Sequence, residues 1–265
     1  MTDCTNIDSA QSKVQRKDLF FAVAAIGIIS AELLLLEFFL SNGLLSVDGY
    51  NYIIFTRSVL KKGWSLSFEE IPSMRGFPPL LPILMLFGAK CGLSLSIAGR
   101  LLNIAGTMLA CQGILFICFT LYKSRQTAFF TALMVCSLPK IYFEGCGILR
   151  DPLFWAEMTW CVYFILQIAR NPGKTTKEQF IKNTIIVLLA SLGCLTRKEG
   201  LPFLLLILSI LTCLNLKNVF IPLKWRILVS LFILVFSGVF VFLPYFFGIP
   251  FVPGDFILYM IESAV

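Results

Sequence analysis

Apolar residues run in long stretches along this chain, and short tracts between the stretches carry most of the charges. A membrane-spanning helix needs about 20 mainly apolar residues, whereas a membrane-spanning strand shows alternation over about ten. The apolar runs in this chain have the length and the continuity expected of membrane-spanning helices. They predict seven membrane-crossing helices, near residues 19–45, 98–122, 127–143, 152–169, 183–196, 200–216 and 227–247. Two of the runs, 127–143 and 183–196, are short, so we expect their helices to extend toward Lys140 and Lys182.

The topology depends on the segment from Phe77 to Leu95, which contains three prolines and whose longest charge-free run is Gly76 to Ala89. A run of this length is typical of an interfacial or re-entrant segment rather than of a crossing. We therefore expect this segment to lie in the membrane interface. If it crossed, every later loop would change sides.

With a cytoplasmic N-terminus and an interfacial 77–95 segment, the later basic residues fall mainly on the cytoplasmic side. Those loops carry Lys123, Arg125, Arg170, Lys174, Lys177, Lys182, Lys217, Lys224 and Arg226. The outer side of the same region carries only Lys140, Arg150, Arg197 and Lys198. The positive-inside rule favours this arrangement. It predicts an outer location for Asp48, Arg150, Asp151, Arg197, Lys198 and Glu199.

The outer segment from about 45 to 97 is too apolar for a solvated loop. Its apolar residues Tyr50, Ile53, Ile54, Val59 and Leu60 have roughly helical spacing, with Arg57, Lys61 and Lys62 between them. Gly63 and Trp64 break the pattern, and Trp64 suits the membrane interface. We expect two short juxtamembrane helices that cover one end of the bundle. The chain then divides into a cytoplasmic tail (1–18), a transmembrane module (19–247) and an outer C-terminal segment (248–265).

Composition agrees with this organisation, because hydrophobic residues make up 58% of the chain, charged residues 14%, and the mean hydropathy is +0.86. A soluble domain has about 25% charged residues. The fold class is therefore an all-α integral membrane protein. The net charge of +7 lies in loops between the runs, which favours contact with lipid headgroups over a nucleic-acid partner.

The chain contains no histidine. This excludes Ser-His-Asp and Cys-His catalysis and histidine metal ligands, so any acid–base chemistry falls to carboxylates, lysine, tyrosine or cysteine. Asp48 is the first candidate, because it directly follows the first apolar run, and an acid at that depth is costly unless it has a use.

Two further outer positions carry candidate chemistry. Asp151 precedes Pro152, which can open a helix, so the simpler role of Asp151 is to cap the N-terminus of that helix. The predicted topology, however, puts Asp151 on the same side of the membrane as Asp48. Arg197 and Lys198 lie between two apolar runs, and two adjacent cations on the outer side favour an anionic partner such as a phosphate. The alternative is a plain turn in which Glu199 pairs locally.

Three acids lie inside predicted crossings. Such residues usually face the bundle interior. Glu37 lies about two turns below the outer end of its helix and can approach the juxtamembrane helices. For Glu32 and Glu157 we favour hydrogen bonding between helices.

The order of these features resembles the GT-C glycosyltransferases, and more narrowly glycosyltransferase family 39, the protein mannosyltransferase and aminoarabinose transferase group. The resemblance covers about residues 15 to 250. Its motifs are Asp48-Gly49-Tyr50, Phe77-Pro78-Pro79-Leu80-Leu81-Pro82, Ala98-Gly99-Arg100-Leu101-Leu102-Asn103, Ile148-Leu149-Arg150-Asp151-Pro152-Leu153 and Leu195-Thr196-Arg197-Lys198-Glu199-Gly200.

The resemblance implies an enzyme that transfers a sugar from a polyprenyl-phosphate donor to an acceptor on the extracytoplasmic face. The membrane would be the plasma membrane in a bacterium or the endoplasmic reticulum in a eukaryote. Asp48 would be the general base and Asp151 the second acid. Arg197, Lys198 and Arg150 would bind the donor phosphate. Candidates to contact the acceptor or line the pocket are Tyr50, Glu37 and Glu199.

Some relatives use a divalent metal ion, and Asp48 and Asp151 are the residues that would support one here. The chain departs from the family in two ways. Gly49 occupies the position where the protein mannosyltransferases have a second acid. The resemblance therefore does not determine whether the acceptor is a lipid, a glycan or a protein. Relatives also continue with further helices beyond a point equivalent to Val265, which implies a fragment or a reduced member.

Two other classes of function fit the same pattern. Acids inside spans and a basic outer site also suit a transporter or a component of a lipid flippase. A non-catalytic membrane scaffold, related to the enzymes but inactive, is the third hypothesis.

Overall fold

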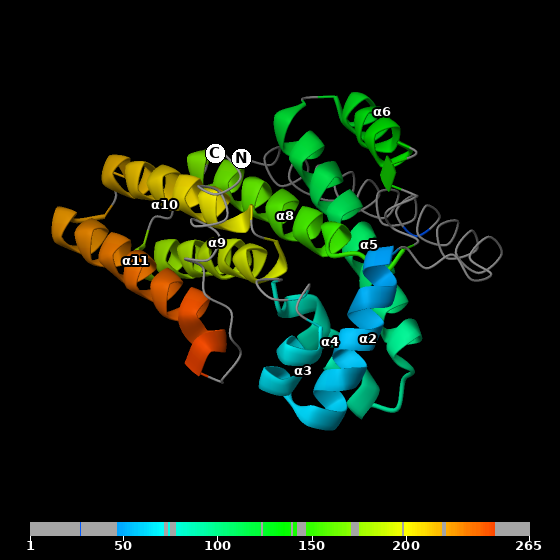
Figure 1. Ribbon diagram of the computed structural model, residues 1–265. Helices are drawn as coiled ribbons and strands as arrows, with labels where there is room; N and C mark the ends of the chain where they lie inside the picture. Colours follow the sequence, from blue (N-terminus) through cyan, green and yellow to red (C-terminus); the bar gives the residue numbers. More distant parts are fainter. Residues whose placement is uncertain are drawn as a thin grey trace, which may run out of the picture.

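The computed structural model describes residues 47–71, 74, 78–122, 124–138, 140–141, 147–170, 175–197, 199–218 and 221–246, together with Gly27. Within these ranges the chain is all-helical and contains no strand (Figure 1). The predicted first crossing at 19–45, with Glu32 and Glu37, lies outside the described residues apart from Gly27. The predicted tail 1–18 and the segment 248–265 lie outside them as well.

Four described helices are long and apolar enough to cross a membrane, which supports a membrane protein. They are α5 (Leu95–Leu121), α8 (Asp151–Arg170), α9 (Thr176–Thr196) and α10 (Gly200–Lys217). Helix α11 (Leu223–Phe246) follows the predicted run at 227–247 and has 24 residues. The larger number of seven crossings stays a prediction.

Two boundaries differ from the sequence-based expectation. The predicted crossing at 127–143 is not one continuous helix, because α6 (Arg125–Cys136) has 12 residues and Ser137 lies in a turn. At about 1.5 Å per residue α6 is only about 18 Å long, so it is too short to cross a membrane by itself. Helix α9 begins at Thr176 rather than at 183, and Lys182 lies inside it, paired with Glu178 at 2.7 Å.

Local signals explain where several helices begin. The hydroxyl of Ser94 accepts the Ile97 N–H at the start of α5, and Thr175 accepts the Glu178 N–H at the start of α9. These are ordinary N-caps. At Gly63 the backbone has φ 82°, which separates α2 (Val47–Lys62) from α3 (Trp64–Glu70). The predicted break at Gly63 is therefore present.

Three glycines of α5, spaced seven residues apart, face α8 and the segment just before it. A Cβ at Gly99 would lie 2.8 Å from Ile148 Cγ2, and one at Gly113 would lie 2.5 Å from Thr159 Oγ1. At Gly106 it would lie 2.8 Å from the backbone nitrogen of Leu153. A seven-residue spacing puts these positions on one helix face, so the backbone of α8 can lie against α5.

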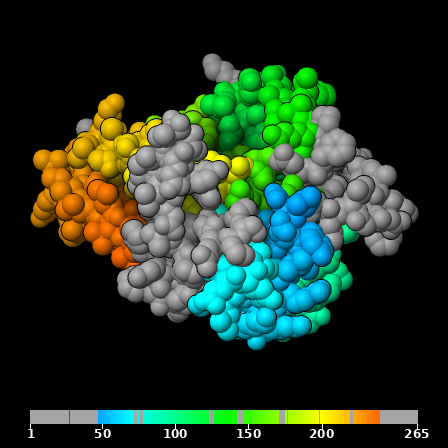
Figure 2. Space-filling model, viewed as in Figure 1, coloured from blue at the N-terminus to red at the C-terminus, as the bar shows by residue number. Residues whose placement is uncertain are grey.

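The helices α2, α3 and α4 (Leu80–Lys90) form the roof, the name used here for these three helices, at one end of the bundle (Figure 1). Their core includes Tyr52, Phe55, Phe68, Leu81 and Met85. In Figure 2 the blue and cyan surface of the roof lies apart from the orange surface of α11. With 11 residues, α4 is shorter than a crossing, as predicted for the 77–95 segment.

The buried face of α2 is not quite the predicted one. Tyr52, Phe55 and Val59 are buried, whereas Tyr50 is 57% exposed and Leu60 46%. The spacing of 52, 55 and 59 is i, i+3, i+7, which is one helix face, and Tyr50 does not share it. Trp64 packs inward against Phe55 and Leu195, so its ring is half-buried in the roof.

The second core lies among α8, α9, α10 and α11. Cys161 of α8, Ile186 and Ala190 of α9, Leu211 of α10 and Ile233 of α11 are almost fully buried there. Leu195, near the end of α9, instead contacts Trp64, Leu80 and Ile83 of the roof. The roof is thus held against the end of α9, and Ile148 joins it to the start of α8.

Candidate active site at the roof end of the bundle

The start of α8 and the end of α9 meet beneath the roof. Asp151 is the first residue of α8, and Pro152 in the first turn is well placed because it has no N–H to lose. Helix α9 ends at Thr196, after which Arg197 adopts extended backbone angles and its N–H bonds the Gly193 carbonyl. The Arg197 side chain extends from the end of α9 toward Asp151 of α8.

The turn from α9 into α10 is tight enough to require a glycine. A Cβ at Gly200 would lie 2.2 Å from the carbonyl oxygen of Gly193, which no side chain could tolerate. The N–H of Gly200 bonds the Arg197 carbonyl at 3.0 Å. This turn holds Glu199 next to Arg197.

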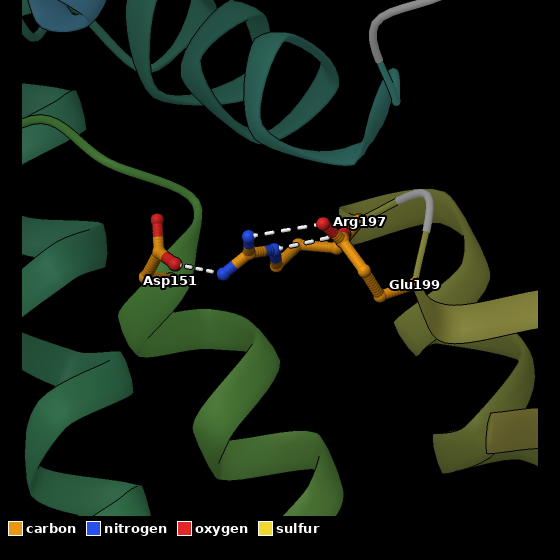
Figure 3. Close-up of polar contacts among 3 residues, drawn as sticks. All are labelled: Asp151, Arg197 and Glu199. Atoms are coloured by element: carbon orange, nitrogen blue, oxygen red, sulfur yellow. Dashed lines mark hydrogen bonds and ion pairs between the residues drawn. The ribbon is translucent and has the colours of Figure 1, made fainter. Parts of the chain in front are cut away.

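Arg197 is the centre of the site (Figure 3). Its Nη1 donates to Asp151 Oδ1. Its Nε and Nη2 donate to the two carboxylate oxygens of Glu199 at 3.1 and 3.2 Å. The guanidinium carbon also lies 5.7 Å from the centre of the Phe154 ring. A two-bonded arginine–carboxylate pair has fixed geometry, so Arg197 is held in one orientation between α8 and α10.

The three side chains differ in their access to solvent. Those of Arg197 and Asp151 are 25% and 21% exposed, and that of Glu199 is 57% exposed. The Asp151–Arg197 pair is therefore partly shielded, whereas Glu199 is the partner that an incoming anion could displace most easily.

The pKa of the Glu199 carboxyl is lowered beside this cation. Burial pushes its pKa upward, but a backbone hydrogen bond and the neighbouring Arg197 outweigh burial, and the net pKa lies below the ordinary glutamate value. The local pairing proposed as the simpler explanation of this turn is thus present, and Asp151 adds a second, long-range partner to it.

Tyr52 is a buried side chain of α2 that lies near three of the predicted charged residues. Burial is the main cause that raises its pKa to about 12, with Arg150 acting in the opposite direction and Asp48 and Asp151 adding to the rise. All three charged residues thus lie within electrostatic range of the Tyr52 hydroxyl. Asp48, on the first turn of α2, precedes Tyr52 by four residues and shares its helix side.

The structure thus places the predicted residues unequally. Asp151, Arg197 and Glu199 are in direct contact, and Arg150 and Asp48 lie close to Tyr52. Tyr50 is exposed on another face of α2. Lys198 and Glu37 lie outside the described residues. The roles assigned to these side chains stay predictions.

The donor set does not fit a metal ion. Among the described residues, no three His, Cys, Asp or Glu side chains are grouped so that they could hold one. Asp151, one of the two carboxylates expected to support a metal, is instead engaged by Arg197. We therefore derive no metal-dependent step.

Sequence reasoning did not assign Tyr52 or Phe154 to this site. The spacing from Asp48 to Tyr52 could have indicated Tyr52, because residues four apart are neighbours on a helix. Phe154 follows Asp151 by one helical turn, but no sequence signal shows that Arg197 would lie over its ring. Glu157 was expected to hydrogen-bond between helices, and this is confirmed, since its Oε1 lies 2.8 Å from Thr196 Oγ1 of α9.

No protein-family model matches the sequence, and neither the curated proteins nor the solved structures contain a significant match.

Proposed function

We propose that this protein is a membrane glycosyltransferase that moves a sugar from a polyprenyl-phosphate donor to an acceptor on the extracytoplasmic face. The observation that carries the proposal is the arginine held between two carboxylates at the roof end of apolar helices, with Asp48 and Asp151 both in electrostatic range of Tyr52. A cation at the end of a membrane bundle suits a phosphate whose lipid chain stays among the helices.

The chemistry of sugar transfer requires two kinds of group. The bond from the anomeric carbon to the phosphate oxygen breaks, and a bond to the acceptor oxygen forms. A base must take the acceptor's proton, and cations must stabilise the charge on the departing phosphate. Asp48 is the proposed base. Arg197 and Arg150 are the proposed phosphate ligands, while Asp151 orients Arg197.

Glu199 has a defined part in this scheme. Its carboxylate occupies the two N–H groups of Arg197 that a phosphate would use. Because Glu199 is the more exposed partner, we propose that the donor phosphate replaces it while Asp151 keeps its bond. The lipid, glycan or protein nature of the acceptor remains open in this proposal.

The test is transfer of a sugar from a polyprenyl-phosphate donor by the chain in proteoliposomes. Replacing the base by Asp48→Asn should lower turnover by about 10²- to 10⁴-fold, with little change in donor binding. The matched control is Glu69→Gln, which neutralises an exposed roof carboxylate. Full turnover by Asp48→Asn would remove Asp48 from the reaction.

A transporter or flippase component is the second candidate, and one observation favours it. Polar side chains are buried inside the bundle, including Glu157 of α8 and Asn183 of α9. Such residues often lie along transport pathways. Movement of a labelled polyprenyl phosphate between leaflets without sugar transfer would select this function.

A further inference from the structure

Glu157 is a buried acid that the proposed reaction does not use. It lies six residues after Asp151, about 9 Å farther along α8, and is only 8% exposed. In the described part of the chain no lysine or arginine pairs with it. Its titratable neighbours are the buried thiols of Cys161 and Cys194, whose hydrogens go to the carbonyls of Ile186 and Ala190.

The hydrogen bonds around Thr196 are better satisfied by a protonated Glu157 than by an ionised one. The Thr196 Oγ1 lies 2.8 Å from Glu157 Oε1 and 2.9 Å from the Leu192 carbonyl oxygen. A hydroxyl has one hydrogen, so two acceptors can only share it in a weaker three-centre bond, as the carbonyls of Trp155 and Ala156 share that of Thr159. If Glu157 carried a charge, it would have only this shared hydrogen, and its Oε2 would be a buried charged oxygen without a hydrogen-bond partner.

A protonated Glu157 satisfies both contacts. Its O–H then donates to Thr196 Oγ1, and the Thr196 O–H donates to the Leu192 carbonyl. The second oxygen, Oε2, has no hydrogen-bond partner. An unpaired neutral carbonyl oxygen is far less costly in an apolar interior than an unpaired carboxylate.

We propose that Glu157 is a neutral carboxylic acid that fixes the last turn of α9 and thereby positions Arg197 against Asp151. Arg197 directly follows Thr196, and its own N–H bonds Gly193 in the same turn at 2.9 Å. Glu157 is thus a positioning residue, and its effect on sugar transfer rests on the proposed function.

Infrared spectroscopy of the whole chain in lipid nanodiscs tests the protonation. At neutral pH the difference between wild type and Glu157→Gln should contain one carbonyl band of a protonated carboxylic acid, which shifts in D₂O. The control Glu178→Gln removes an exposed, ion-paired carboxylate and should show only carboxylate bands. Carboxylate bands for Glu157→Gln would overturn the proposal.

Binding of farnesyl phosphate tests the positioning of Arg197 independently of any transfer. Thr196→Val should weaken binding about fivefold, because the link to Glu157 is lost. Thr196→Ser keeps the hydroxyl and should restore binding to the wild-type level. Glu157→Gln should bind within about twofold of wild type, because its amide N–H can donate to Thr196. Wild-type affinity in Thr196→Val would overturn the positioning role.

The two proposals fail in distinguishable ways. If the infrared band and the binding series behave as expected but no sugar is transferred, the glycosyltransferase fails and the role of Glu157 stands. If the wild-type chain does not bind farnesyl phosphate, the positioning role and the proposed function both fail. The infrared band still decides the protonation of Glu157 by itself.

Discussion

The two ends of α9 are both held by polar side chains, but by chemically different ones. Near its start, Gln179 and Asn183 donate to the Asn215 side-chain oxygen of α10 at 2.6 and 2.9 Å, and Asn218 lies 3.4 Å from Gln179. These four amides are at most 4% exposed. At the other end the charged group of Asp151, Arg197 and Glu199 is 21% to 57% exposed.

The difference follows from the cost of burying charge. Amides can be enclosed at modest cost when their hydrogen bonds are made, whereas a buried ion pair loses much of its solvation. The amide cluster joins α9 and α10 in the buried interior through Asn215 Oδ1, while Asn183 Oδ1 and Asn215 Nδ2 have no hydrogen-bond partner there. The charged group remains accessible, which is what an anionic ligand would need.

The largest expected effect comes from removing the cation at the charged end. Arg197→Met should lower sugar transfer by about 10²- to 10³-fold, because the phosphate loses its main stabilising group. Arg197→Lys should recover only part of this, because lysine lacks the planar fork. Transfer rates in proteoliposomes measure both. The control Arg57→Met removes an exposed roof cation, and an equal loss there would show a nonspecific charge effect.

The next effect breaks the amide end. Asn215→Leu leaves the amide N–H groups of Gln179 and Asn183 without their acceptor, and should lower the free energy of unfolding by about 1–3 kcal/mol. Denaturation of the detergent-solubilised chain measures this. Ser209→Ala, on an exposed part of the same helix, should change it much less. Equal stability of Asn215→Leu and wild type would refute a structural role of the cluster.

A smaller effect concerns Glu199. Because it is well exposed, Glu199→Gln should raise the affinity for farnesyl phosphate by at most about fivefold.

The folded-state pKa of Glu199 is lowered, so its stabilising pairing is complete above the ordinary glutamate pKa and is lost as pH falls through the lowered value. Wild type should thus lose more stability than Glu199→Gln between about pH 6 and pH 3. Identical acid profiles would contradict this.

The smallest effect lies in the roof, away from both ends of α9. Hydrogen bonds from Ser58 (2.7 Å) and Lys62 (3.1 Å) lower the pKa of Glu70. Their contribution is therefore present above the ordinary glutamate pKa and disappears in acid. Glu70→Gln should slightly weaken the junction of α2 and α3 without changing transfer. Thermal unfolding at neutral and acidic pH, with Glu69→Gln as the reference, measures the difference.

The sequence pattern predicted the positions of most long helices well, but it predicted contacts between helices poorly. The runs at 98–122, 152–169 and 200–216 correspond to α5, α8 and α10 within a few residues. The run at 183–196 missed the first two turns of α9, because those turns carry the charged residues Lys177, Glu178 and Lys182. Gln179 in the same turns is polar yet buried, and only its partner Asn215 on α10 makes it part of the interior.

Part of the site was visible in the sequence as unusual charges at the ends of apolar runs. That reasoning selected Asp48, Asp151, Arg197 and Glu199. It could not show that Arg197 binds Asp151 and Glu199 together, because the Asp151 contact depends on how α8 and α9 pack.

By itself the sequence determined a helical chain suited to a lipid bilayer, since uncharged runs of this length can make all their backbone hydrogen bonds in a membrane only as helices. It also determined that any acid–base chemistry relies on groups other than histidine. The tertiary structure decided which charges meet, how closely α5 and α8 approach along their glycine face, and how Glu157 reaches Thr196. These are long-range contacts, and their geometry arises only when separate helices are packed against one another.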